Sequence, residues 1–413
     1  MTRTEFLLVS SMGLSEVASA VSVGLPQLRG GVPQHSSVGN LFDQIGNYAR
    51  ANPPSLSFLS RRWKDVREWK VTARAKVFDR LSYRPPSVPF DARVVSKKKR
   101  RGYLQEDIVF RTTPYTEVPA SVLVPTAGKP PYPAIVALHD HGGFYYFGRE
   151  KLLEEDRRST IFADFCNKLY QGVPYAAELA RAGYVVMVIA AFYFGQRRLR
   201  IDTLPPGKAD RLLHLGPDSD DFIVAFNELA GSYESLVAKT IFMAGTSWPG
   251  MIVWDDLRSV DYLLTRTEVD QHRVGCAGLS LGGFRSAYLA GCHSAVRSAV
   301  VTCWMSTFGP MLAGYAERHT WMCYTPDLYT DLDFPDIAGM ATPNALLVQF
   351  GRYDALFPPD GKRQAADKLK LIYAKAGVPE NFKASLYDTP HMFSVDMQQE
   401  TIEWFDKTLK KER

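Results

Sequence analysis

The segment Gly278–Gly282, with the sequence GLSLG, constrains the fold of this chain most, because it joins two segments of different character. Before it, Arg273–Ala277 is mostly small and apolar, as a strand buried on both faces should be. After it, Gly283–Ala290 contains no proline and can be helical. Glycines on both sides of Ser280 allow a sharp bend that holds the serine Oγ above the sheet edge. The pattern predicts a strand-to-helix turn that presents Ser280 as a nucleophile.

Two later apolar runs end in the residues that such a serine requires, in the order serine, acid, histidine. Asp354 follows the run Ala345–Phe350, and carboxyl ends of parallel strands are where open α/β sheets place their chemistry. His391 follows the run Phe382–Tyr387. A serine hydroxyl needs an imidazole to take its proton, and the imidazole needs a carboxylate to fix its tautomer. We therefore predict a catalytic triad of Ser280, Asp354 and His391.

Each member of this triad also has a simpler interpretation. Ser280 could be an ordinary turn residue, and Asp354 could cap the helix that follows it. His391 could be a solvated loop histidine, although it alone of the eight histidines follows a plausible last strand. Asp388 is an alternative acid, but it lies so close to His391 in the sequence that we expect a loop role for it.

An oxyanion hole is expected near the apolar run Ala134–Leu138, which ends in the sequence HDHGGF. One donor should be the amide of Leu281, directly after the nucleophile, and the other should come from Gly142 or Gly143. The pair His139 and His141 could instead indicate a metal. No cluster of Asp, Cys or His accompanies the pair, so we predict neither a metal site nor a cofactor.

Four segments of the chain resemble the dienelactone hydrolase and acetyl xylan esterase-like branch of the α/β hydrolases. They are Leu138–Gly143, Val253–Leu263, the GLSLG turn and Pro358–Gly361. The resemblance extends from residue 103 to the C-terminus and implies an α/β-hydrolase fold with Ser280, Asp354 and His391 as nucleophile, acid and base. Dienelactone hydrolases proper carry a cysteine nucleophile, so the serine favours carboxylester cleavage. The related acetyl xylan and cephalosporin esterases show Gly-x-Ser-Gln-Gly-Gly, and Leu281 stands here in place of the glutamine.

The order of segments predicts a doubly wound, mostly parallel sheet, because strand-like and helix-like stretches alternate after residue 103. The 413 residues exceed a single domain core of about 250 residues. We assign 1–102 to an N-terminal extension with a tail and helices, and 103–413 to the catalytic domain. Two long stretches near 192–250 and 304–343 interrupt the alternation. We expect these insertions to form the walls and lid of the pocket.

Aromatic residues near the expected site predict a pocket that suits a short acyl group. Phe144 and Tyr145 begin a run of four aromatics beside the oxyanion glycines, which should admit acetyl and exclude long chains. Trp248 and Trp304, in the two insertions, are further pocket candidates. Arg197, at a strand exit, is either a salt-bridge partner or a substrate contact.

Composition narrows the partners and the compartment. The net charge of +5 is small, and we interpret the basic cluster Lys97–Arg101 as a solvated linker, so we expect neither nucleic acid nor membrane as a partner. The odd number of five cysteines indicates a reducing compartment without a disulfide framework. This favours the cytoplasm. The segment Phe6–Ala20 faintly resembles a signal peptide and keeps a secreted or periplasmic location open, and a homo-oligomer is also open.

The leading functional hypothesis is a serine carboxylesterase that hydrolyses short-acyl, acetyl-like esters of a small molecule or carbohydrate through an acyl-enzyme. A second hypothesis is a serine peptidase of the prolyl oligopeptidase kind. Such enzymes usually add a large all-β propeller, for which the first hundred residues are too short and too helical. A third is a catalytically inactive hydrolase fold used for binding, against which the intact triad argues.

Overall fold

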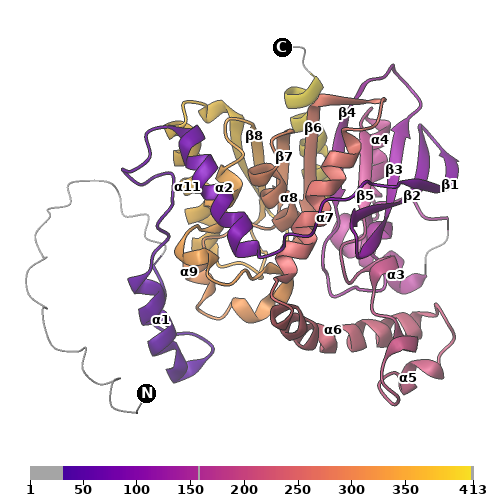
Figure 1. The fold of residues 1–413 in the computed structure, drawn as a ribbon, viewed down its shortest axis with the longest axis horizontal. Coiled ribbons are helices and arrows are strands. Elements are labelled where there is room, and N and C mark those ends of the chain that lie inside the picture. The colour runs from indigo at the N-terminus through magenta and orange to yellow at the C-terminus, as the bar shows by residue number, and fades with distance from the viewer. Residues whose placement is uncertain (1–30, 157–158, 411–413) are drawn as a thin grey trace, which may run out of the picture.

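One nine-stranded sheet forms the centre of the molecule in a computed structural model that describes residues 31–156 and 159–410. The strand order is β1-β2-β3-β5-β4-β6-β7-β8-β9 (Figure 1). In this order, each pair of neighbouring strands from β1 through β2 and β3 to β5 is antiparallel. Each pair from β5 through β4, β6, β7 and β8 to β9 is parallel. The strands are β1 Arg93–Arg100, β2 Tyr103–Thr113, β3 Thr116–Pro125, β4 Tyr132–Leu138, β5 Val185–Ile189, β6 Val269–Leu279, β7 Val296–Thr302, β8 Ala345–Gly351 and β9 Phe382–Tyr387. The predicted doubly wound, mostly parallel sheet is confirmed.

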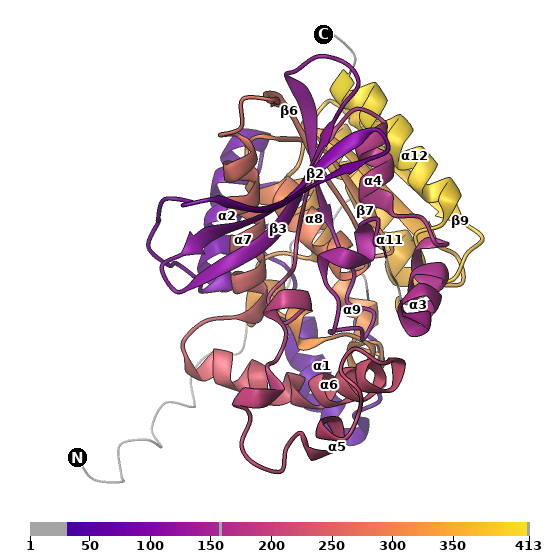
Figure 2. The same ribbon diagram turned by 90° about the vertical axis from the view of Figure 1, so that its right-hand side faces the viewer.

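Helices cover both faces of this sheet. They are α1 Phe42–Ala51, α2 Val66–Leu81, α3 Thr160–Tyr170, α4 Tyr175–Arg181, α5 Asp210–Leu213, α6 Asp220–Met243, α7 Trp248–Leu263, α8 Leu281–Cys292, α9 Phe308–Met311, α10 Phe334–Gly339, α11 Pro359–Lys375 and α12 Val395–Phe405. Figure 2 shows α2 and α7 on one side of the sheet and α4 and α12 on the other. In β4, Ala134 and Val136 join the first of two cores, while Ile135 and Ala137 join the second. This burial on both faces explains why β4 lacks polar residues.

The insertions and the extension carry helices of their own. The stretch 192–250 contains α5 and α6, and the stretch 304–343 contains α9 and α10. In both views α5 and α6 lie below the sheet, at the same end as α1 (Figures 1 and 2). Helix α7 starts at Trp248, because the Ser247 side chain accepts a hydrogen bond from the Gly250 amide and Pro249 fits the first turn.

The basic cluster is part of the sheet. Lys97–Arg100 lies in β1, which pairs with β2, so the interpretation of this cluster as a linker was wrong. Lys97 forms an ion pair with Glu106, and Arg100 forms one with Asp156. An exposed edge strand rich in lysine resists pairing with other chains, and its run of charged residues at 97–100 hid it from the sequence pattern. The sheet therefore begins before residue 103, where we place the start of the catalytic domain.

All five cysteines lie within the described residues, where they are buried and form no disulfide bond. Across 31–156 and 159–410, no single helix is both long and apolar enough to cross a membrane; α6 and α7 meet that criterion only as a pair bent by 82°. The segment Phe6–Ala20 lies outside the described residues.

A buried ion pair joins the two helices beside the central strands. Arg285 on α8 donates two hydrogen bonds, of 2.9 and 2.6 Å, to the carboxylate of Asp256 on α7, and neither side chain is exposed. Asp256→Ala leaves the guanidinium buried without a counter-charge, so we expect it to lower the free energy of unfolding by about 3–5 kcal/mol. Urea unfolding of the full chain measures the loss.

The matched control for that prediction is Glu117→Ala. It breaks the exposed pair between Glu117 and Arg93, whose side chains are 48% and 58% exposed, and should cost far less. Equal losses in the two variants would show that the buried pair between Arg285 and Asp256 gives no particular stability.

Candidate active site

Ser280 occupies the turn between β6 and α8 in a backbone conformation that few residues other than glycine adopt, with φ 58° and ψ −120°. Its amide donates to the carbonyl of Thr302 at 2.9 Å, which fixes the turn. The flanking glycines serve close packing: a Cβ on Gly278 would lie 2.5 Å from the carbonyl oxygen of Leu138, and one on Gly282 only 2.1 Å from it. The positive φ thus falls on Ser280 itself, a strain typical of functional sites.

Asp354 and His391 come together although 37 residues separate them in the chain. The Nδ1 atom of His391 lies 2.8 Å from Oδ2 of Asp354, which is 3% exposed. The other carboxylate oxygen accepts the amide of Leu356 at 2.9 Å. A proton on Nδ1 facing Asp354 leaves Nε2 of His391 free to accept one from a nucleophile.

A lysine that the sequence analysis did not single out holds the loop of this acid. The Nζ of Lys362, on α11, donates to the carbonyls of Gly351, Arg352 and Asp354 at 2.9, 3.3 and 3.2 Å. Burial lowers the pKa of Lys362, and the charge of Asp354 opposes that shift. Asp388 instead forms an exposed ion pair with Arg352. The structure therefore brings Asp354, and not Asp388, to His391.

The thiol of Cys303 lies close to Asp354 and His391. Ligand atoms of Cys303, Asp354 and His391 all lie within 4.8 Å of one another, and these three residue types can bind a metal. Burial raises the pKa of the Cys303 thiol to about 12, so with no metal bound the thiol stays protonated.

The loop after β4 contains two glycines with positive φ angles. Gly142 and Gly143 have φ angles of 56° and 66°, which side chains would disfavour. The Gly143 amide donates to Nδ1 of His141 at 3.0 Å. Within the described residues, the amides of Gly142 and of Leu281, in the first turn of α8, donate to no protein acceptor. Of the three amides predicted to form an oxyanion hole, those of Gly142 and Leu281 have no protein acceptor among the described residues, whereas the Gly143 amide is bonded to His141.

Glu234, on α6, connects this loop to both insertions. Its carboxylate accepts hydrogen bonds from His141 Nε2 at 2.7 Å, from Tyr145 at 2.8 Å and from Thr320 at 2.9 Å. Burial disfavours its ionisation, but these hydrogen bonds outweigh burial and lower the pKa of the carboxyl. Because the proton of the His141 ring stays on Nε2, where it is donated to Glu234, the Nδ1 atom presents a lone pair to the Gly143 amide. No sequence pattern marked this network, since its members are far apart in the chain.

Comparisons with known proteins agree with this architecture. A search found no family model that matches the chain. The structure of a putative acetyl xylan esterase from Bacteroides fragilis NCTC 9343 superposes with a TM-score of 0.63 at 19% identity, covering 85% of this chain and 84% of that one. The glucuronoyl esterase from Solibacter usitatus gives a TM-score of 0.58 at 13% identity, covering 86% and 96%. The chain has the α/β-hydrolase fold.

A curated relative is similar over most of its length. The chain is 23% identical over 343 residues to the protein of Bacillus subtilis (strain 168) named Putative hydrolase YtaP, covering 82% of this chain and 100% of that protein. In the α/β-hydrolase fold, β6 and α8 carry the nucleophile elbow, so Ser280 stands at the position where the fold places a nucleophile.

The four aromatic pocket candidates lie in different environments. Phe144 is 7% exposed and stacks on Phe165 at 4.5 Å, while Tyr145 is tied to Glu234. Trp304 is 3% exposed and packs edge-on against His319 at 5.4 Å. Trp248 has no exposed surface and offers nothing to a ligand, so we leave it out of the proposed pocket.

Arg197 is a salt-bridge partner, which is one of the two roles that we considered for it. It forms an ion pair of 2.7 Å with Asp255, and the two side chains are 7% and 5% exposed. Its guanidinium also donates to the carbonyl of Ala190, directly after β5. These contacts attach the start of the first insertion to α7.

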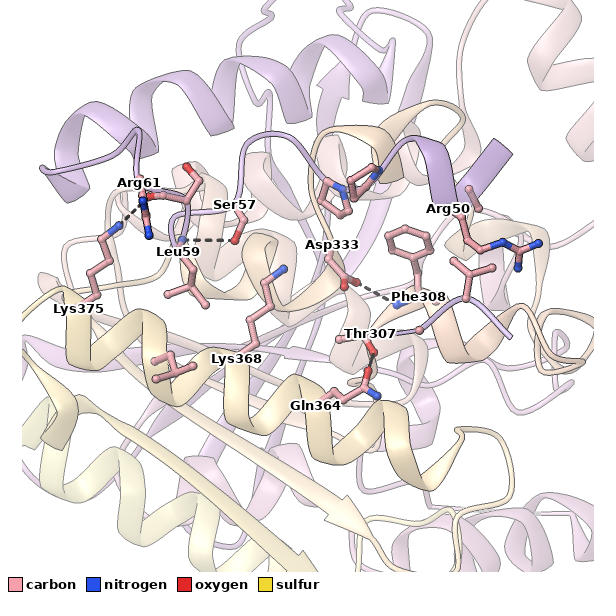
Figure 3. Close-up of a pocket in the computed structure, with 18 of the residues that line it drawn as sticks. Arg50, Ser57, Leu59, Arg61, Thr307, Phe308, Asp333, Gln364, Lys368 and Lys375 are labelled. Atoms are coloured by element: carbon pink, nitrogen blue, oxygen red, sulfur yellow. Dashed lines mark hydrogen bonds between the residues drawn. The ribbon is translucent and has the colours of Figure 1, made fainter. Parts of the chain in front are cut away.

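A separate cavity of about 960 Å³ lies between the N-terminal extension and α9–α11 (Figure 3). Its lining includes Arg50 and Leu59 from the extension, with Phe308, Asp333 and Lys368 opposite. Lys368 forms an ion pair with Asp336 at 2.6 Å. None of the three triad residues lines this cavity, so it takes no part in the chemistry considered below.

Proposed function

We propose that the protein is a serine carboxylesterase that acts on short-acyl esters, with Ser280, His391 and Asp354 as its triad. The observation that carries the proposal is the 2.8 Å hydrogen bond between His391 and the buried Asp354, together with the strained elbow that presents Ser280. His391 and Asp354 come from two separate loops of an α/β-hydrolase sheet and have no structural need to pair in this way.

The chemistry follows from these positions. Asp354 holds the proton of His391 on Nδ1, so Nε2 takes the proton of Ser280 as its Oγ attacks the ester carbonyl. The amides of Leu281 and Gly142 stabilise the negative oxygen of the tetrahedral intermediate. His391 then gives its proton to the departing alcohol, and a water activated in the same way releases the acid from the acyl-enzyme.

The names of similar proteins support hydrolysis of an ester bond. They are a putative hydrolase, a putative acetyl xylan esterase and a glucuronoyl esterase. A peptidase of the prolyl oligopeptidase kind is less favoured, because the described residues before β1 form helices α1 and α2 rather than a propeller. Hydrolysis of p-nitrophenyl acetate compared with an aminoacyl p-nitroanilide tests this choice. A faster reaction with the anilide would contradict the esterase proposal.

We expect kcat/KM to fall at least about tenfold from acetyl to octanoyl esters of p-nitrophenol, which is ~1.4 kcal/mol of barrier. The physical reason is a rigid wall beside the oxyanion loop. Phe144 is stacked on Phe165 and Phe147, and Tyr145 is held by Glu234, so neither ring can easily move aside for a long chain. A series of p-nitrophenyl esters at fixed pH measures the profile.

A variant of the same wall serves as the control. Phe144→Ala removes the stacked ring and should recover part of the octanoyl activity while changing acetyl hydrolysis little. A flat or rising profile in the unmodified protein would mean that the aromatics form an open acyl groove.

A further inference from the structure

Three consecutive residues of the second insertion span the site from one side to the other. Arg318 donates to the carbonyl of Ala355 at 2.5 Å, and His319 donates through Nε2 to the carbonyl of Leu356 at 3.0 Å. Both acceptors directly follow the catalytic acid candidate Asp354. The next residue, Thr320, donates to Glu234, which holds the oxyanion loop. The strip 318–320 therefore joins the acid loop to the oxyanion loop.

His319 lies at the middle of this strip with one ring nitrogen unused. Because Nε2 donates to Leu356, the neutral ring carries its proton there and has a lone pair on Nδ1. Among the described residues no protein group donates to this Nδ1, nor is it among the buried polar atoms that lack a partner, so it is open to solvent. Burial lowers the pKa of His319 to about 4, so at neutral pH the Nδ1 atom remains an acceptor.

The surroundings of His319 place it on the alcohol side of the ester. Its Nε2 donates to the carbonyl of Leu356, whose own amide donates to Asp354, the partner of His391, so the ring lies close to the proposed acid–base pair. His391 delivers its proton to the departing alcohol, so a group beside His391 faces the alcohol and not the acyl chain. Trp304 and Phe357, with centroids 5.4 and 4.7 Å from the imidazole, add apolar surface around it.

We propose that Nδ1 of His319 accepts a hydrogen bond from a hydroxyl group on the alcohol part of the substrate, next to the ester. The substrates are then esters of polyols or sugars in which a free hydroxyl neighbours the acylated oxygen. This inference rests on the esterase function proposed above. A neutral hydroxyl fits better than an ammonium donor, because the guanidinium of Arg318 adds positive charge close to the same ring.

Two esters with the same acyl group test the proposal. Glycerol 1-acetate carries a hydroxyl next to the ester, and propyl acetate matches its chain length without one. The unmodified protein should prefer glycerol 1-acetate in kcat/KM. His319→Gln can keep an N–H for Leu356 but loses the acceptor at Nδ1. It should lower kcat/KM for glycerol 1-acetate at least about fivefold and change that for propyl acetate less than about twofold.

His319→Asn is the matched variant. Its amide oxygen can reach the position of Nδ1, while its short side chain loses the bond to Leu356. It should therefore keep the preference for glycerol 1-acetate, even if both rates fall together. Loss of the preference in His319→Asn but not in His319→Gln would show that the bond to Leu356 matters instead, and would overturn the proposal.

The outcomes separate this inference from the function on which it rests. If the protein hydrolyses neither ester nor p-nitrophenyl acetate, the esterase proposal fails and the role of His319 fails with it. If it hydrolyses propyl acetate but prefers it to glycerol 1-acetate, or if His319→Gln slows both esters equally, the esterase stands and only the role of His319 is refuted.

Discussion

Replacing Ser280 with alanine should lower kcat by about 10⁴-fold or more and leave the fold intact. The members of a triad act as a unit, so removal of the nucleophile leaves only the contributions of binding and of the oxyanion donors. Alanine at position 280 should also cause no packing conflict, because β4 makes its close approach to this turn at the glycines on either side of Ser280. Steady-state hydrolysis of p-nitrophenyl acetate measures the loss, and circular dichroism checks the fold.

A second serine, Ser286 on α8, provides the control. Ser286 is fully buried, and its hydroxyl has no hydrogen-bond partner within the described structure. Ser286→Ala should therefore keep activity near the original level, and a fluorophosphonate probe should label this variant but not Ser280→Ala. The nucleophile assignment is wrong if folded Ser280→Ala keeps a tenth of the activity.

Replacing Asp354 with asparagine should lower kcat by about 10³–10⁴-fold. The carboxylate oxygen that faces His391 Nδ1 at 2.8 Å becomes part of an amide, which can present N–H in its place. The imidazole then carries its proton on Nε2 and cannot take one from Ser280. The amide stays close in size to the carboxyl, so the loss in kcat should occur in a folded protein, as thermal unfolding can confirm.

Asp388→Asn is the matched control, because Asp388 lies three residues before His391 but pairs with Arg352 at the surface. We expect it to change kcat far less than Asp354→Asn does. If Asp388→Asn proved the more damaging of the two, Asp388 would be the acid, and the contact between Asp354 and His391 would be structural.

The elements nearest the site could be predicted because their signals are local. Strands β4 and β8 and the second half of β6 are apolar runs buried on both faces, so their positions are visible without any knowledge of their neighbours. Ser280 directly follows β6, whereas Asp354 follows β8 after two residues and His391 follows the less buried β9 after three. In a parallel sheet these ends meet at one edge. Strand β1 was missed for the opposite reason: it lies at the edge and carries lysines where an interior strand carries apolar residues.

The groups around the triad could not be predicted, because their contacts join distant parts of the chain. Lys362, Glu234 and His319 are polar residues in a helix or an insertion, and nothing beside them in the sequence marks them. Glu234 meets His141 across 93 residues and Thr320 across 86. The environment of Trp248 could not be predicted either. The sequence indicated a loop there, whereas in the structure Trp248 is the buried first residue of α7.

By itself, then, the sequence determined the order of the strands after β1, the sharp turn at Ser280 and the choice of acid and base candidates, since these depend on apolar runs and glycines next to one another. Only the tertiary structure decided which carboxylate meets His391, which glycine amide is free, and that His319 lies over the acid loop. Those contacts depend on where the two insertions pack, and packing between distant segments leaves no periodic pattern in the sequence.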